Sequence, residues 1–492
     1  MPSTNKNPSS VKPLRILLAT EYLPPFVSGI ANRCKNLVKG YRAHGHTVTV
    51  FGPPGSDCDI QVGSIPNPFY DEQRLMFQCL NPFADVPYDV AHIVGPLCLS
   101  FLFVLPLLRL RGVKLYVSYH VALEYYKQKY FNEIMGMFLE GMFLVFYFIP
   151  LVYFADVVGI PSKSADYCVF KYSKRIHYMR SGLDTSVFKP KPENHFPDED
   201  DYLKPSQAPA PLSISSLKPF GSDSVHASTP MTQRQTHLIH QLHTQNHIKS
   251  HAPVLLYVGR LAIEKNIEFL IRALAHPNLV TAKLVLVGDG PSRESLEILA
   301  RETVGAARVF SNNNKDAGDK TAVSANHIDV SSGAVTVCPQ ARVLFAGMVH
   351  SEAIVSRYYA SADVFVSASS SETFGFTVAE ALACGTPSVM VRGGAFRSVY
   401  RMIDGWMFEE MDMEDYVGRV GRVVADGILA RRIARRTAVE HFGVMGAVKD
   451  LLKTYQMCIT GVFWEEEGLK KGGSETAAAV AALSNDTNKK DN

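Results

Sequence analysis

Short apolar runs alternate with longer amphipathic stretches along much of this chain. Residues 15–20 (RILLAT) and 46–52 (HTVTVFG) have the length of strands, and residues 30–45 between them carry apolar positions at helical spacing and end in glycine. The same order continues with strand-like runs at residues 89–95 and 113–120. Strands that alternate with helices build a parallel sheet with helices on both of its faces. The first part of the chain is therefore predicted to be a doubly wound α/β domain.

A second series of the same kind follows an interruption. Residues 191–252 are rich in Pro, Ser, Gln and His and show no apolar period, which predicts a linker or an expanded loop. Helices are predicted at residues 264–275 and 292–304, and residues 305–339 read as another polar insertion. The strands predicted in this part lie at residues 252–261, 282–290, 341–349, 363–369 and 387–391. The predicted fold class is α/β, with two Rossmann-like doubly wound domains that face a cleft.

The changes of pattern give the predicted domain boundaries, and a chain of 492 residues is long for a single core. The predicted parts are a disordered N-terminus (1–13), an N-terminal domain (14–190), a linker or insertion (191–252), a C-terminal domain (253–440) with its insertion (305–339), a crossover helix (441–464) and a disordered tail (465–492).

Composition excludes several classes of protein. The chain has 50 basic and 47 acidic residues and a formal net charge of +3, which gives no reason to expect a nucleic-acid partner. Its eight cysteines are far apart and form no C-x-x-C motif, so they indicate buried thiols in a reducing compartment. The first apolar run is too short for the core of a signal peptide. We therefore predict a cytoplasmic or organelle-stroma protein that is not secreted.

Two apolar stretches, residues 97–110 and 142–155, raise the question of a membrane. Each has about 14 residues and contains a proline, whereas a spanning helix needs about 20 apolar residues. We favour buried helices of the N-terminal domain. The alternative is a helix on a membrane surface, for which the aromatic and lysine residues of the nearby run 125–130 (YYKQKY) are suited.

The strongest candidate site is the stretch from residue 369 to 387, which places Glu372 and Glu380 on either side of Gly375. A helix is predicted to begin just after Gly375, and its N-terminus is a natural anion site. The backbone N–H groups at this end belong to Phe374, Gly375, Phe376 and Thr377. A ligand with a central diphosphate and a hydroxyl-rich ring at each end fits this layout, with Glu372 on a hexose and Glu380 on a ribose. An ordinary helix with an acidic first turn is the alternative.

Four further residues follow strands at the predicted cleft. Arg260 and Lys265, in VGRLAIEKN, are placed to neutralise a leaving diphosphate, although surface ion pairs would explain them too. Gly29 joins the first strand to the first helix, so a second helix N-terminus faces the cleft. His120 ends the strand that finishes in SYH, where it is either a functional residue or a satisfied core histidine.

Other motifs are weaker. Histidines spaced three or four residues apart in the linker would share one face of a helix, but no carboxylate or cysteine joins them. They are His237, His240, His243, His247 and His251. Asp57 and Asp59 form the D-x-D pair of a metal-dependent transferase, but they follow a strand of a doubly wound domain and read as chance. Residues 288–293 (GDGPSR) lack the third glycine of a nicotinamide-binding loop.

In combination, these motifs resemble glycosyltransferase family 4, the retaining enzymes of the GT-B fold. The E-x7-E of SSSETFGFTVAEALACGTPSV occurs beside YVGRL-x3-K, LVGDGP, FAGMV and YYASADVFVSAS, and the likeness runs from about residue 14 to 464. FVSGIANR and VGRLAIEK further resemble the sulfoquinovosyl diacylglycerol synthases and lipid mannosyltransferases. The resemblance implies transfer of a hexose from a nucleotide diphosphate sugar, with a UDP-sugar favoured, to a lipid or glycan acceptor at a membrane surface. It implies no metal and no further cofactor.

The same resemblance assigns roles to individual residues. Arg260 and Lys265 would grip the diphosphate, and His120 would contact the sugar near the reacting carbon. Glu372 would contact the donor sugar and Glu380 its ribose. The remaining residues implied at the nucleotide-sugar site are Gly29, Gly347, Phe374, Gly375, Phe376 and Thr377. Three alternatives stay open, namely a GDP-mannose-dependent mannosyltransferase, a nucleotide-sugar epimerase of the same fold, and a non-catalytic sugar-nucleotide-binding protein.

Overall fold

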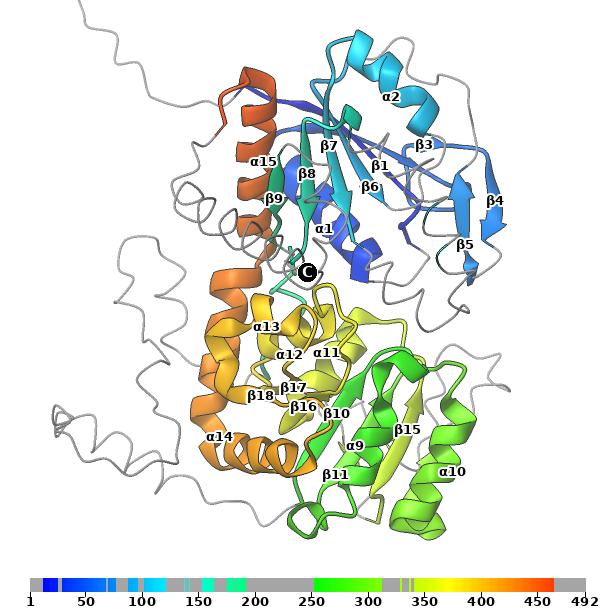
Figure 1. Cartoon of the computed structure of the whole chain (residues 1–492), viewed down its shortest axis with the longest axis vertical. Coiled ribbons are helices and arrows are strands. Elements are labelled where there is room, and N and C mark those ends of the chain that lie inside the picture. Colours follow the sequence, from blue (N-terminus) through cyan, green and yellow to red (C-terminus); the bar gives the residue numbers. More distant parts are fainter. Residues whose placement is uncertain are drawn as a thin grey trace, which may run out of the picture.

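Two parallel sheets, each covered by helices, make up the two lobes seen in Figure 1. This confirms the predicted fold class. The structure is a computed structural model, and it describes residues 12–24, 29–67, 70–76, 87–95, 101–120, 137, 141, 153–162, 175–180, 182–191, 252–311, 328–329, 336–337 and 340–463.

The N-terminal sheet has the strand order β3-β2-β1-β6-β7-β8-β9, and all of its neighbouring strands are parallel. Its strands are β1 (Arg15–Thr20), β2 (Thr47–Gly52), β3 (Ile60–Gln61), β6 (Val90–Gly95), β7 (Lys114–Tyr119), β8 (Val157–Ile160) and β9 (Ile176–Tyr178). Because side chains alternate along a strand, Leu17 and Ala19 of β1 pack in the same cluster as Leu105 of α2 (Phe101–Leu110). Ile16 and Leu18 pack on the other face, against α1 (Gly29–Ala43) and α15 (Val444–Thr460).

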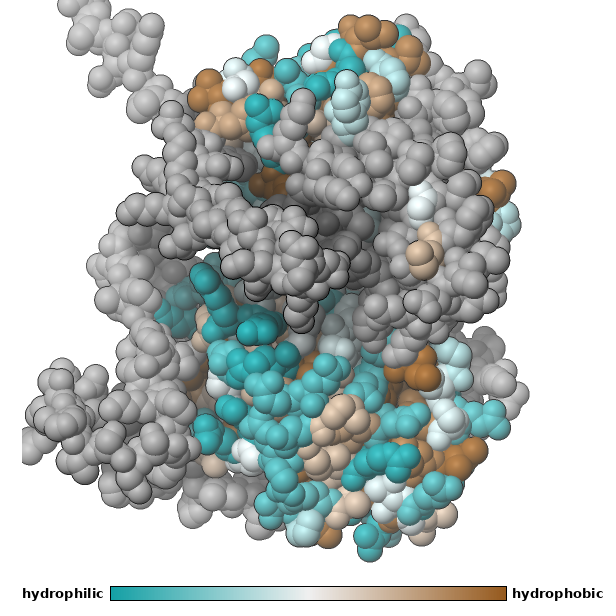
Figure 2. Space-filling view, in the orientation of Figure 1, coloured by the Kyte–Doolittle hydropathy of each residue, from teal (hydrophilic) through white to brown (hydrophobic). Residues whose placement is uncertain are grey.

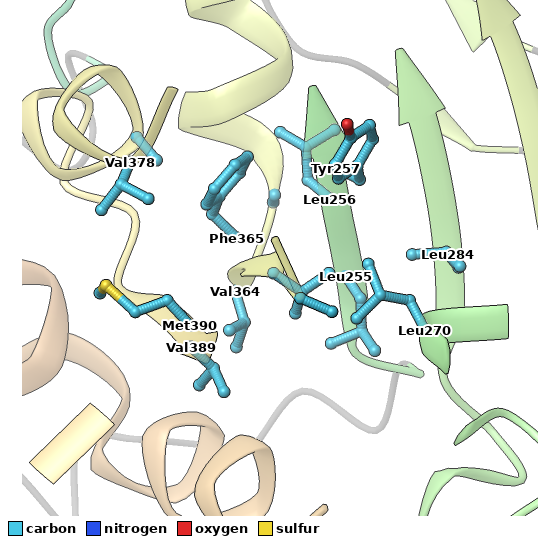
Figure 3. Packing of buried hydrophobic residues seen from close by; sticks show 14 of the residues in the cluster. Leu255, Leu256, Tyr257, Leu270, Leu284, Val364, Phe365, Val378, Val389 and Met390 are labelled. Atoms are coloured by element: carbon cyan, nitrogen blue, oxygen red, sulfur yellow. The ribbon is translucent and has the colours of Figure 1, made fainter. Parts of the chain in front are cut away.

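The C-terminal sheet has the order β12-β15-β11-β10-β16-β17-β18, again with parallel neighbours. Its strands are β10 (Val254–Val258), β11 (Lys283–Val287), β12 (Val309–Ser311), β15 (Val343–Gly347), β16 (Val364–Ser367), β17 (Ser388–Val391) and β18 (Met407–Phe408). Its helices are α9 (Ile267–Ala273), α10 (Arg293–Val304), α11 (Glu352–Ser361), α12 (Phe376–Ala383), α13 (Phe396–Val399) and α14 (Met413–Phe442). Figure 3 shows apolar side chains of β10 and β16, among them Leu256 and Phe365, packed in the core of this domain.

The chain passes between the domains at two places that lie side by side. Leu183 donates its N–H to the carbonyl oxygen of Phe442 at 2.8 Å, and Val444 donates to the carbonyl oxygen of Leu183 at 2.8 Å. Helix α14 thus ends in the C-terminal domain, and after Gly443 helix α15 packs on the N-terminal domain (Figure 1). The last helix therefore ties the end of the chain to the first domain.

Several expected boundaries differ from the structure. Residues 309–311 form the edge strand β12 and pair with β15, so the insertion predicted at 305–339 begins too early. The helix predicted at 264–275 is a 3-10 turn (Ile263–Lys265) and then α9, because Asn266 has a left-handed φ of 51°. The sequence analysis also missed the hairpins formed by β4 (Ser64–Asn67) with β5 (Tyr70–Met76) and by β13 (Ile328–Asp329) with β14 (Thr336–Val337).

Helix α2, from the apolar stretch 97–110, is buried on one side and exposed on the other. Leu105 and Leu108 are in the core, whereas Leu107 is 41% exposed and Leu110 is 85% exposed. Figure 2 shows hydrophobic residues at the outer end of the N-terminal lobe, where Figure 1 places α2. Among the residues that the structure describes, no helix is both long and apolar enough to cross a bilayer. Residues 125–130 and most of 142–155 lie outside the described residues.

Leu451 of α15 tests how firmly the last helix is bound to the N-terminal domain. Its side chain is fully buried in the cluster with Leu37 and Tyr41 of α1. We expect Leu451→Ala to destabilise the protein by about 3 kcal/mol, because a buried leucine leaves a cavity. The measurement is the urea midpoint of unfolding. Leu429→Ala, the same change at a half-exposed position of α14, should have little effect, and equal losses would contradict this account.

Candidate active site between the two domains

The N-terminus of α12 is the centre of the candidate site. Gly375 precedes the helix with a left-handed φ of 82°, which glycine adopts without strain. A Cβ on Gly375 would lie 2.4 Å from the ring of Phe396, so no larger residue fits without movement. The hydroxyl of Tyr400 donates to the carbonyl oxygen of Gly375 at 2.8 Å and fixes this turn. The helix begins at Phe376, as predicted, with Thr377 partly exposed beside it and Phe374 buried below.

A second helix N-terminus meets this one across the domain boundary. Helix α1 begins at Gly29, and a Cβ there would lie 2.7 Å from Cδ2 of Phe376. The residue must therefore be glycine for the two domains to approach this closely. Each helix N-terminus carries a partial positive charge of about half a unit and backbone N–H groups without intrahelical partners. The two predicted anion-binding residues Gly29 and Phe376 are thus brought together by the fold.

Lys265 and Glu372 form an ion pair at the same place. Nζ of Lys265 lies 2.6 Å from Oε1 of Glu372, and both side chains are about one fifth exposed. The loop that carries Glu372 is held from two sides, since Ala395 donates its N–H to the Glu372 carbonyl at 3.0 Å and Ser369 Oγ donates to the Glu264 carbonyl at 3.3 Å. Arg260 is exposed just after β10, and its carbonyl accepts the Tyr257 hydroxyl at 3.0 Å.

Glu380 lies in the body of α12 and is buried. The hydroxyl of Tyr359, on α11, donates to Oε2 of Glu380 at 2.9 Å. Burial raises the pKa of Glu380 to about 8, although the bond from Tyr359 opposes the rise. The carboxyl group therefore keeps its proton at neutral pH in the free protein, and it can both donate and accept a hydrogen bond.

Three strands of the C-terminal domain end in glycines with positive φ, which lets their backbones approach one another. They are Gly259 after β10, Gly288 after β11 and Gly347 at the end of β15. Gly288 donates its N–H to the Gly347 carbonyl at 2.9 Å, and a Cβ on Gly288 would lie 2.0 Å from the Gly259 carbonyl oxygen. Gly347, which the resemblance assigns to the nucleotide-sugar site, is thus part of the edge where these strands end.

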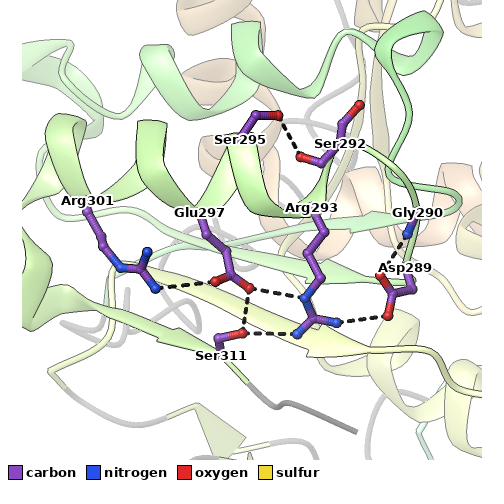
Figure 4. Close-up of polar contacts among 8 residues, drawn as sticks. All are labelled: Asp289, Gly290, Ser292, Arg293, Ser295, Glu297, Arg301 and Ser311. Carbon is purple, nitrogen blue, oxygen red and sulfur yellow. Dashed lines mark hydrogen bonds and ion pairs between the residues drawn. The ribbon is translucent and has the colours of Figure 1, made fainter. Parts of the chain in front are cut away.

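A charged network secures the outer end of this edge (Figure 4). Arg293 bridges Asp289 at 3.1 Å and Glu297 at 3.1 Å, and it also donates to Ser311 of β12 at 3.0 Å. Arg301 adds a further ion pair to Glu297. The network joins the loop after β11 to α10 and to the edge strand, so it supports the loop that follows β11.

His120 follows β7 in the other domain and is 5% exposed. Its Nε2 lies 3.1 Å from Oγ of Ser118. Burial, together with the nearby Arg33 and His92, holds the pKa of His120 well below its usual range. The imidazole is therefore neutral at physiological pH.

The sequence analysis missed two buried ionisable groups of the N-terminal domain. Arg33 of α1 is 1% exposed, and within the described part of the chain its Nε has no hydrogen-bond partner. Glu21 follows β1 and accepts the Met76 N–H at 2.7 Å, while its second oxygen has no hydrogen-bond partner among the residues that the structure describes. Burial raises the pKa of Glu21 well above its usual range. Arg33 was visible in the FVSGIANR motif, but no pattern in the sequence marks Glu21 or shows that either group is buried.

The weaker candidates of the sequence analysis have different outcomes. The five linker histidines lie outside the described residues. Asp59 of the D-x-D pair accepts the Val50 N–H at 2.7 Å and pairs with Arg42 at 3.0 Å, so it supports the turn after β2. Within the described ranges, no three His, Cys, Asp or Glu residues are grouped so that they could hold a metal ion.

Family models match parts of both domains. Residues 27–187 match the model of Glycosyltransferase Family 4, and residues 239–326 and 338–439 match that of Glycosyl transferases group 1. The fold and the matched domains define a GT-B glycosyltransferase. The chain belongs to glycosyltransferase family 4, as the resemblance in the sequence indicated.

The individual proteins that resemble this chain have low sequence identity to it. The sulfoquinovosyl transferase SQD2 of Arabidopsis thaliana is 23% identical over 435 residues, which cover 84% of this chain and 68% of the relative. The alpha-monoglucosyldiacylglycerol synthase of Streptococcus pneumoniae is 23% identical over 394 residues, or 76% of this chain and 70% of the relative. The structure of sucrose-phosphate synthase from Thermosynechococcus elongatus matches with a TM-score of 0.57 at 17% identity, covering 91% of this chain and all of the other.

The raised pKa of Glu380 predicts a pH-dependent stability difference. The folded state holds the Glu380 proton up to about pH 8, whereas the unfolded chain loses it near the ordinary value of 4.5. The folded state therefore loses stability as the pH rises from about 4.5 to about 8, because ionisation favours the unfolded chain. Glu380→Gln removes this loss, so its melting temperature should rise relative to the wild type between pH 5 and pH 8. A difference that stays constant over this range would contradict the burial argument.

Proposed function

We propose that this glycosyltransferase moves a hexose, with retention of its anomeric configuration, from a nucleotide diphosphate sugar to a membrane lipid such as diacylglycerol. A UDP-sugar is the favoured donor, and a sulfoquinovosyltransferase-like reaction is the favoured activity. The observation that carries the proposal is the Lys265–Glu372 ion pair beside the facing N-termini of α1 and α12. A cation, two helix ends and a carboxylate suit a diphosphate joined to a sugar.

Each group has a place in the reaction that we infer. The bond between the anomeric carbon and the diphosphate breaks, and its electron pair leaves with the diphosphate. Arg260, Lys265 and the helix N-termini stabilise this developing charge. The acceptor hydroxyl oxygen bonds to the anomeric carbon on the same face, and its proton passes to the departing phosphate oxygen. Glu372 contacts the sugar hydroxyls and His120 the sugar near the reacting carbon, while Glu380 binds the ribose.

Metal-independent transfer is part of the proposal. The positive charge that a divalent cation would supply is provided by Arg260, Lys265 and the two helix ends. Asp59, the nearest match to a metal-binding D-x-D motif in the sequence, is paired with Arg42 away from this site.

The lipid acceptor is supported by the exposed side of α2. Leu107 and Leu110 are exposed there, and the ion pair between Arg109 and Asp156 at 2.7 Å holds the segment after Tyr153 beside this helix. Tyr153 is itself 75% exposed. Apolar and aromatic side chains next to basic ones suit the headgroup layer of a membrane. The synthase of a glucosylated diacylglycerol among the relatives points to the same class of acceptor.

Removal of either partner of the central ion pair tests the catalytic assignment. We expect Glu372→Gln and Lys265→Ala each to lower transfer at least about a hundredfold, because each loses a charge that acts on the donor. The measurement is release of the nucleoside diphosphate in the presence of acceptor vesicles, with circular dichroism to show that the fold persists. Arg436→Ala, which breaks a partly exposed ion pair on α14, is the matched control and should retain activity. Wild-type turnover in either site variant would remove the assignment.

A thermal-shift panel tests the donor. A ligand that binds only the folded state stabilises it by about 2.7 kcal/mol at a hundred times its dissociation constant. UDP-glucose or UDP-sulfoquinovose should raise the melting temperature more than GDP-mannose does, and EDTA should not remove the shift. A larger shift with GDP-mannose would favour a mannosyltransferase. Release of an epimerised sugar nucleotide without acceptor would instead identify an epimerase.

A further inference from the structure

A continuous line of hydrogen bonds runs from His120 through the interior of the N-terminal domain to the last helix. It crosses from β7 to β6, then to α15 and finally to α1. The bonds join His120 Nε2 to Ser118 Oγ (3.1 Å), Ser118 Oγ to His92 Nε2 (2.9 Å), His92 Nδ1 to the Tyr455 hydroxyl (2.7 Å), and the Tyr455 hydroxyl to the Tyr41 hydroxyl (2.8 Å). We call these five residues the relay.

Burial isolates the relay from water. Four of its members have no measurable exposure, and the fifth, His120, is 5% exposed. Each hydroxyl and each neutral imidazole supplies a single proton, so when every one of these protons is donated within the line, the hydrogen bonds along it all run in one direction.

The direction of the line decides the tautomer of His120. If the Tyr455 hydroxyl donates to His92 Nδ1, then His92 Nε2–H donates to Ser118, and Ser118 donates to a bare His120 Nε2. His120 then carries its proton on Nδ1. If every bond is reversed, Nε2 of His120 carries the proton and Nδ1 offers a lone pair. In either case the relay sets whether Nδ1, the ring nitrogen that takes no part in the relay, carries a proton or a lone pair.

A second proton on either imidazole does not complicate the choice between the two tautomers of His120. Burial, with Arg33 as the next cause, holds the pKa values of both His92 and His120 well below the usual range. The two imidazoles are neutral, and the position of one proton is the remaining variable. The side chain of Arg33 is fixed nearby, with Nη2 at 3.4 Å from Sδ of Met179.

We propose that Tyr455 of α15 is a positioning residue, whose hydroxyl acts through His92 and Ser118 to hold His120 in a single tautomer. This inference rests on the proposed function in its claim that His120 meets the donor sugar. It assigns to the last helix, which follows the whole C-terminal domain in the chain, a part in completing the active site of the first domain.

The same cluster offers a matched control. Tyr116 is as deeply buried as Tyr455, and the two rings lie 5.4 Å apart. The Tyr116 hydroxyl bonds Nδ1 of His177 at 2.9 Å, and His177 Nε2 bonds Asp450 at 2.8 Å. This second line contains none of the relay residues. Tyr116→Phe therefore removes one buried hydroxyl from the same surroundings and leaves the relay intact.

The first test is the tautomer itself, measured without any ligand. The full chain is labelled with 15N-histidine, and the His120 nitrogen signals are identified by their loss in His120→Gln. We expect one tautomer in the wild type and in Tyr116→Phe. In Tyr455→Phe the tautomer ratio should shift by about fivefold to tenfold, the equilibrium effect of one hydrogen bond. An unchanged ratio in Tyr455→Phe, or the same shift in Tyr116→Phe, overturns the proposal.

The second test is turnover, followed as UDP release from UDP-glucose with diacylglycerol vesicles. Tyr455→Phe should lower kcat by about fivefold to tenfold with little change in the donor KM, and Tyr116→Phe should leave both unchanged. Ser118→Ala breaks the relay between the two histidines, so it should produce the same losses and stands in if Tyr455→Phe does not fold. Adding Tyr455→Phe to Ser118→Ala should have no further effect on kcat, and additive losses overturn the relay.

The two tests separate the inference from the proposed function. If His120→Gln keeps full turnover, the proposed role of His120 fails, while the tautomer measurement still decides whether the relay exists. If His120→Gln is inactive and Tyr455→Phe is normal in both tautomer and kcat, the relay fails and the proposed function stands.

Discussion

The candidate site depends on the close approach of two helix N-termini across the domain boundary. Helices α1 and α12 meet through Gly29 and Phe376, and their like partial charges repel at this distance. The approach is maintained by contacts elsewhere, such as the ion pair between Lys35 and Glu352 at 3.3 Å and the paired backbone at Leu183. An anion between the helix ends would remove the repulsion, so the fold has a place for negative charge before any ligand binds.

Local patterns in the sequence were sufficient for the fold class and for most of the central strands. Runs such as 16–19 and 284–287 are apolar throughout because parallel strands are buried on both faces, and this makes them recognisable. The short hairpin of β4 and β5 was missed because neither strand carries a continuous apolar run. Edge strand β12 was taken for part of a polar insertion, since its three residues are only partly buried.

The site was predictable to the extent that its residues are close in sequence. Glu372, Gly375 and Glu380 share one strand-loop-helix unit, so their spacing carried the information. Lys265 and Glu372 are 107 residues apart, and their pairing depends on how two neighbouring strands lie in the sheet. Tyr455 and His92 are 363 residues apart, and nothing local to α15 indicates that its hydroxyl meets a histidine of β6.

The ion pair between Lys265 and Glu372 in the free protein affects how the phosphates and the sugar of a donor would bind. Lys265 and Glu372 satisfy each other at 2.6 Å while they are only about one fifth exposed, so neither charge is left without a partner. A diphosphate that takes Lys265 as its counter-ion competes with Glu372 for the ammonium group, and a carboxylate that it displaces then needs new hydrogen-bond donors. On the proposed function the hydroxyl groups of the donor sugar are those donors. Binding of the phosphates and recognition of the sugar are thereby coupled through one ion pair, and a nucleotide without its sugar would leave Glu372 unsatisfied.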